Sequence, residues 1–154
     1  MRPDPAFGAP RLGVLARRSR WPSERIAGTM RFVPMDAFPT LDDLFWLFEV
    51  EPRIEEPDVG WPISAAIYTT TRGRWQITVG IEPYLYFVRV VLSHQGVETV
   101  RLELDEVETV AVDRGTHGIE ALVVTFAPPS SLKPLRMTLK PVVSLALLTK
   151  RAWE

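Results

Sequence analysis

The segment between Tyr84 and Val112 constrains the fold of this chain more than any other part of the sequence. Successive side chains of a strand point to opposite faces, so the residues of one face recur at every second position. In the first half of the segment one such face is wholly apolar and consists of Tyr86, Val88, Val90 and Leu92. The other face is mostly apolar as well, which is typical of a central strand covered on both sides.

The second half of this segment alternates in a different way. Val100, Leu102 and Leu104 are separated by polar residues, a pattern that indicates a strand with one buried and one solvent-exposed face. Gly96 lies in the short connection between the two halves and suits the positive φ of a tight hairpin turn. The sequence therefore predicts an antiparallel hairpin at this place.

Alternating segments continue on both sides of the hairpin. The further predicted strands cover residues 63–71, 75–82, 108–113, 119–126 and 135–140. Residues 142–150 suit a strand or a helix, and Val142-Val143 favours a strand. Because strands joined by short turns pair with their sequence neighbours, we predict an antiparallel meander of about seven strands that forms a curved sheet or an open barrel.

One helix is predicted, and it begins after Thr40. The hydroxyl of Thr40 can cap the first free N–H groups, and the carboxylates of Asp42 and Asp43 favour the positive end of the helix dipole. Helical spacing places a group of apolar side chains on one face, namely Leu41, Leu44, Phe45 and Phe48, with Leu47 beside them. Pro52 predicts an end near Val50. A helix in the N-terminal half that packs on a meander gives the fold class α+β.

The charges divide the chain into two parts. Residues 1–31 contain seven arginines against two acidic residues, whereas the remaining 123 residues carry a net charge of −6. We predict that residues 1–31 form a disordered basic tail, because they are rich in proline and lack a sustained apolar period, and that 32–154 is a single domain. Nucleic-acid binding would depend on the arginines of this tail alone, namely Arg17, Arg18, Arg20 and Arg25, so it is not expected.

Several classes of chemistry are excluded or unsupported. The chain has no cysteine, which rules out disulfides, thiolate catalysis and cysteine-bound metal. It has neither a nucleophile-elbow serine nor a glycine-rich phosphate loop. His94 and His117 lie in predicted turns, and the acidic residues between 98 and 108 alternate with core positions as on a solvated sheet face. We therefore expect no enzymatic activity, no metal and no cofactor. Apolar runs too short for a membrane span predict a cytoplasmic protein.

The strongest candidate for function is a binding surface on the predicted helix. Trp46 projects from the polar side of this helix among acidic residues, and tryptophan is over-represented among interface hot spots. The predicted partner-binding residues are Trp46, Asp42, Asp43, Glu49, Glu55 and Glu56. The competing interpretation is that Trp46 belongs to the core, or is covered by the N-terminal tail.

In its size, its acidic body and its lack of catalytic groups, the chain resembles the immunity proteins of bacterial toxin systems. The likeness is one of general character and involves no motif. It implies a small protein-binding module whose acidic face neutralises a basic protein. Two alternatives are a ligand-binding sheet or barrel, with aromatic residues lining a cavity, and a structural subunit that buries a strand against another chain. The aromatic residues in question are Tyr68, Tyr84, Tyr86 and Phe87.

Overall fold

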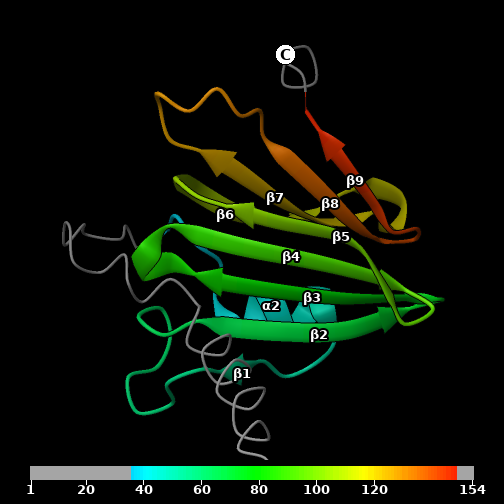
Figure 1. The fold of residues 1–154 in the computed structure, drawn as a ribbon, viewed down its shortest axis with the longest axis horizontal. Helices are drawn as coiled ribbons and strands as arrows, with labels where there is room; N and C mark the ends of the chain where they lie inside the picture. The colour runs from blue at the N-terminus through cyan, green and yellow to red at the C-terminus, as the bar shows by residue number, and fades with distance from the viewer. Residues whose placement is uncertain (1–35, 149–154) are drawn as a thin grey trace, which may run out of the picture. The chain divides into compact units, whose positions relative to one another are not determined.

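The computed structural model describes residues 36–148, which belong to one compact unit, Phe32–Glu154. Its α-helix, α2 (Leu41–Phe48), precedes a long series of strands (Figure 1). The strands are β1 (Arg53–Ile54), β2 (Ala66–Arg72), β3 (Trp75–Glu82), β4 (Phe87–His94), β5 (Val97–Leu104), β6 (Val107–Arg114), β7 (Glu120–Phe126), β8 (Leu135–Lys140) and β9 (Ser144–Leu147). The predicted disordered tail lies outside the described residues.

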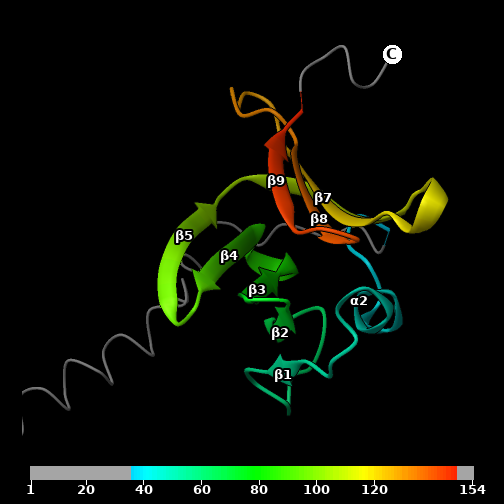
Figure 2. The same ribbon diagram turned by 90° about the vertical axis from the view of Figure 1, so that its right-hand side faces the viewer.

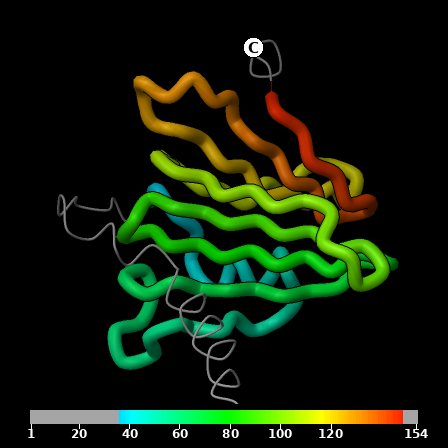
Figure 3. The backbone as a smooth tube through the Cα atoms, viewed as in Figure 1, coloured from blue at the N-terminus to red at the C-terminus, as the bar shows by residue number. Residues whose placement is uncertain are grey.

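The strands form two antiparallel sheets in which each strand pairs only with strands adjacent to it in sequence. One sheet has the order β1-β2-β3-β4-β5 and the other the order β6-β7-β8-β9. The backbone trace shows the two successive meanders clearly (Figure 3). The predicted α+β class and the meander are confirmed, and the sheets are curved without closing into a barrel.

The described residues contain nine strands where about seven were predicted, divided between two sheets. The division falls between β5 and β6, where Glu106 adopts a left-handed φ of 55°. The backbone N–H of Val107 then donates to the carbonyl of Tyr86, 3.0 Å away. The short β1 lies in the segment after α2, where no strand was predicted, and β9 supports the strand interpretation of the C-terminal segment.

The core lies between the inner faces of the two sheets and α2. The largest fully buried side chains include Leu44, Leu47 and Phe48 from α2, Ile77, Val79 and Ile81 from β3, Val88 and Val90 from β4, and Leu122, Met137 and Leu139 from the second sheet. The helix contacts β2 of the first sheet and β6 and β7 of the second (Figure 2). The helix therefore joins the two sheets through its apolar face.

Both ends of α2 are fixed by specific hydrogen bonds. The Thr40 hydroxyl accepts from the N–H of Asp43 at 3.1 Å, while the Asp43 carboxylate accepts from the N–H of Thr40 at 3.4 Å. This capping box confirms the predicted start. At the other end Glu49 adopts a left-handed φ of 59°, and Arg72 of β2 donates to the carbonyl of Phe48 at 3.2 Å. The predicted end near Val50 is also confirmed.

The prediction that Phe45 belongs to the buried face of the helix is wrong. Its side chain is 46% exposed, while Leu44, Leu47 and Phe48 are fully buried. At 100° per residue, these three side chains occupy an arc whose centre is roughly 110° from Phe45. The two sheets cover this arc, so Phe45 lies outside it.

The predicted strand from Tyr84 begins three residues late. Pro83–Leu85 forms a turn of 3-10 helix, and Tyr86 follows with a φ of 53° before β4 starts at Phe87. Proline at the first helical position has a φ suited to such a turn and lacks the N–H that a strand would use. From Phe87 onward the predicted alternation holds, with Val88, Val90 and Leu92 in the core.

Candidate functional site

Trp46 lies between two cationic side chains of the second sheet. The guanidinium carbon of Arg114, at the end of β6, is 4.3 Å from the centre of the indole, and the Nζ atom of Lys140, at the end of β8, is 5.9 Å away. Both distances are within the range of cation–π attraction. Trp46 is half-buried and packs against the core. It therefore combines the two interpretations given above, since one part of the ring supports the fold and another part reaches the surface.

Two of the predicted acidic site residues are already paired within the chain. The Asp43 carboxylate lies 3.1 Å from the guanidinium of Arg114. The Glu49 carboxylate bridges the two sheets, with one oxygen 3.2 Å from Arg72 and the other 2.6 Å from Lys140. The hydrogen bond from Lys140 is the main reason that the pKa of Glu49 is lowered. The acidity of α2 is therefore partly neutralised by its own sheets, while Asp42 is exposed.

The loop after α2 presents the remaining acidic side chains. Its exposed acidic residues are Glu51, Glu56 and Asp58, and Glu55 is half-buried. Hydrogen bonds hold the loop in place. The N–H of Glu55 donates to the carbonyl of Ala65 at 3.0 Å, and the N–H of Glu56 donates to the hydroxyl of Ser64 at 2.7 Å. Val59 and Ile63, 48% and 55% exposed, add apolar surface to the same loop.

The acidity of the folded unit is concentrated in this part of the chain. Residues 36–63 hold eight acidic residues and one basic residue, Arg53, so their net charge is −7. The rest of 32–154 has a net charge of +1. The predicted residues Glu55 and Glu56 belong to the loop, while Trp46, Asp43 and Glu49 surround the contact between α2 and the second sheet. The structure thus divides the predicted site into two neighbouring parts of one acidic stretch.

Glu82, the last residue of β3, was not among the predicted site residues. It is a buried carboxylate, and its pKa is raised to about 7, first by burial and then by repulsion from Glu55. Perturbed carboxylates of this kind are typical of functional sites. Its position in the sequence is only a weak signal of burial, because an acidic residue at a strand end and before a proline is ordinarily exposed.

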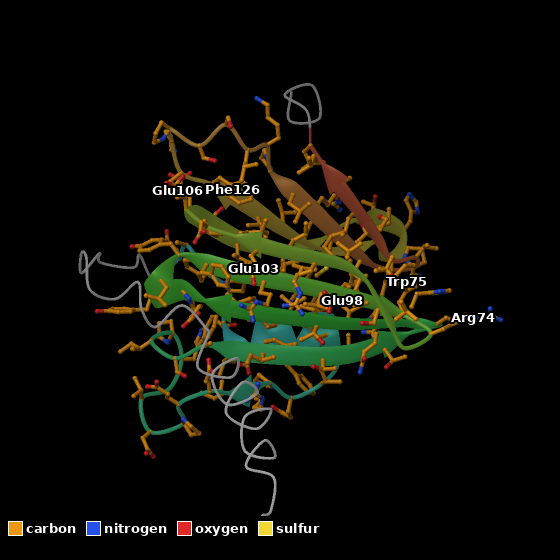
Figure 4. All side chains as sticks on the ribbon, viewed as in Figure 1. Arg74, Trp75, Glu98, Glu103, Glu106 and Phe126 are labelled. Atoms are coloured by element: carbon orange, nitrogen blue, oxygen red, sulfur yellow. The ribbon has the colours of Figure 1, made fainter. Side chains whose placement is uncertain are left out.

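The acidic residues between 98 and 108 were predicted to lie on a solvated sheet face, and those of β5 do so. Glu98 pairs with Arg101 at 2.7 Å, and Glu103 pairs with Arg89 at 3.0 Å. Figure 4 shows these glutamates along β5, with Glu106 before β6. Glu98 and Glu103 lie near opposite ends of β5, and each is paired with a different arginine.

The aromatic residues proposed to line a ligand cavity do not share one environment. Tyr68 is fully buried in the core and stacks on Phe48 with ring centres 4.7 Å apart, and burial raises the pKa of its hydroxyl. A cleft of about 320 Å³ lies elsewhere, beside the start of α2. Its lining residues are Asp36, Phe38, Pro39, Thr40, Asp43, Ala111, Val112 and Arg114. None of the four aromatic residues takes part in it.

No group of three or more histidine, aspartate or glutamate side chains within residues 36–148 is placed to hold a metal ion. In the same part of the chain, no helix has the length and apolar character needed to cross a membrane.

A solved structure shares this fold. It is described as a contact-dependent growth inhibition toxin–immunity protein complex from Klebsiella pneumoniae 342. The matching chain of that complex superposes with a TM-score of 0.64 at 14% sequence identity, and the match covers 75% of this chain and 96% of that chain. At this identity the likeness shows the fold alone. No protein-family model matches the sequence, and it has no significant match among curated proteins.

Proposed function

We propose that this chain is a protein-binding module that docks a basic protein on the acidic surface formed by α2 and the loop after it, in the manner of an immunity protein and its toxin. The observation that carries the proposal is the net charge of −7 within residues 36–63, in a folded unit that is otherwise close to neutral. Such a concentration of one sign of charge attracts a partner of the opposite sign and orients it on approach. The fold shared with a chain of a toxin–immunity complex supports the same conclusion.

The centre of this surface contains the aromatic side chains that an interface needs. Phe45 is 46% exposed and lies on α2 next to Trp46, whose ring is half-buried. Interface hot spots are enriched in aromatic residues surrounded by polar groups. Asp42 on the helix and Glu56 and Asp58 on the loop supply such groups. Phe45 is therefore the primary apolar anchor of the proposed interface, and the half-buried Trp46 is a second aromatic contributor.

The proposal is tested by affinity capture from a lysate of the cells that naturally express this chain. The baits are the wild type, Phe45→Ala, Trp46→Ala and the double variant Asp42→Lys/Glu56→Lys. Glu108→Lys is the matched control, because Glu108 is an exposed glutamate on β6, outside the acidic stretch. Circular dichroism and urea unfolding first establish that each bait is folded.

We expect the wild type and the Glu108→Lys control to retain one basic protein in stoichiometric amount, and the other variants to lose it. Retention should weaken as the salt concentration rises, because salt screens exposed charges. The proposal is wrong if the wild type retains no basic protein, or if the acidic-surface variants retain it as well as the control does.

A further inference from the structure

The outer face of the first sheet carries a carboxylate whose environment is unusual. Glu82 is only 8% exposed, and its buried Oε2 atom has no hydrogen-bond partner among residues 36–148. A buried carboxylate oxygen without a partner lacks the hydrogen bonds that water would give it in the unfolded chain, and this loss destabilises the fold. Such a group requires an explanation beyond the stability of the fold.

Strand register places Glu82 and Glu55 in one row of this face. The N–H of Glu55 bonds the carbonyl of Ala65, and the pairing of Ala66 with Ile81 places Ala65 opposite Glu82. Adjacent strands are about 4.8 Å apart, so the Cα atoms of the two glutamates are separated by roughly 10 Å. Ala65, whose side chain is a single methyl group, occupies the strand position between them. Glu56 follows directly and is held by the hydroxyl of Ser64.

Among the described residues, negative charges around Glu82 exceed positive ones. Glu55 and Glu56, beyond β1, both act to raise its pKa, and burial also raises the pKa of Glu55. The counteracting cation is Arg89 on β4, which pairs with Glu103 of β5 at 3.0 Å. Arg53 of β1 and Arg89 both act to lower the pKa of Glu55, and Ala65 before β2 brings no charge. Among residues 36–148, the carboxylates Glu55, Glu56, Glu82 and Glu103 therefore outnumber the nearby cations, Arg53 and Arg89.

We propose that Glu55, Glu56 and Glu82 form the binding site for one arginine or lysine side chain of the basic partner. The positive charge of this side chain favours the ionised form of the Glu82 carboxyl, so binding promotes the release of its proton to solvent. The proposal rests on the proposed function for the nature of this partner. A guanidinium or ammonium group supplies positive charge to the three carboxylates and a hydrogen-bond donor to the buried Oε2 atom of Glu82. The exposed side chains of Val59 and Ile63 can cover the aliphatic stem of the incoming residue.

The site is tested on the full chain with n-butylguanidinium as the probe and n-butylurea as its uncharged control. Carbon-detected NMR follows the side-chain carboxyl signals across a pH titration. With saturating n-butylguanidinium we expect the pKa of Glu82 to fall by about one pH unit, a tenfold shift in its protonation equilibrium, whereas n-butylurea leaves it unchanged. The exposed Glu106 and Glu108 report general ion pairing and should not move. Glu56→Gln should weaken the response several-fold, and Glu108→Gln should not.

The inference is overturned if the Glu82 signal does not respond, if Glu106 and Glu108 respond equally, or if n-butylurea has the same effect. These outcomes are separate from those of the capture experiment. A captured basic protein together with an unresponsive Glu82 would remove this site and leave the proposed function standing. A responsive Glu82 without a captured protein would remove the proposed function and leave a site for organic cations.

Discussion

Replacing Glu82 by glutamine should stabilise the fold, and the gain should depend on pH. The carboxyl group of Glu82 has a pKa of about 7 in the folded chain against an ordinary value of 4.5. The folded state therefore binds more protons than the unfolded state between these two values, so the free energy of unfolding falls as the pH rises through this window. At 1.36 kcal/mol per pH unit, the full loss is about 3 kcal/mol. Glutamine cannot ionise and should avoid this loss.

The measurement is urea unfolding followed by tryptophan fluorescence, at intervals from pH 4 to pH 8.5. We expect wild type and Glu82→Gln to have nearly equal free energies of unfolding at pH 4, where Glu82 is protonated in both states. The variant should become more stable by about 3 kcal/mol above pH 8. Glu108→Gln is the matched control, because it removes an exposed carboxylate of β6. A difference that stays constant across the window, or that the control reproduces, would refute the reasoning.

Three further substitutions probe α2. Thr40→Ala removes the side-chain half of the capping box and should lower the free energy of unfolding by about 1 kcal/mol, measured as a lower urea midpoint; an unchanged midpoint would contradict this role. Arg72→Met leaves the carbonyl of Phe48 without its donor and should cost about 1–3 kcal/mol in the same assay, whereas the exposed Arg74→Met should cost almost nothing. Phe45→Ala should change stability by less than about 0.5 kcal/mol yet weaken partner binding at least tenfold by calorimetry, and a stability loss as large as that of a core residue would show that it packs in the interior.

The fold class and most of the elements could be predicted because the relevant signals are local. Alternation in the β4–β5 region and the Thr40 cap each require only a few neighbouring residues, and both predictions hold. The division into two sheets was not predicted. It occurs at Glu106, which adopts a left-handed φ, and glutamate is not a residue type that indicates such a turn. The exposure of Phe45 depends on which arc of the helix the sheets cover, and that is decided by distant residues.

Only part of the candidate site could be predicted from the sequence. An acidic, aromatic surface around Trp46 could be proposed from helical spacing. The ion pairs that partly neutralise its carboxylates could not be predicted in this way. Glu49 meets Lys140 across 91 positions of sequence, and Asp43 meets Arg114 across 71. Likewise, Glu82 is perturbed by carboxylates that the pairing of β1 with β2 brings near. Electrostatic environment is a property of tertiary contacts, so composition alone does not reveal it.

The pairing of every strand with its sequence neighbour has a consequence for the kinetics of folding. Each hairpin closes a short loop, so most contacts within the sheets are local, and local contacts speed folding relative to folds dominated by distant strand pairings. The helix is different, because its ion pairs with Arg114 and Lys140 join residues far apart in sequence. We expect the two meanders to form in the rate-limiting step and α2 to dock afterwards. In that case Thr40→Ala would accelerate unfolding and leave the refolding rate almost unchanged.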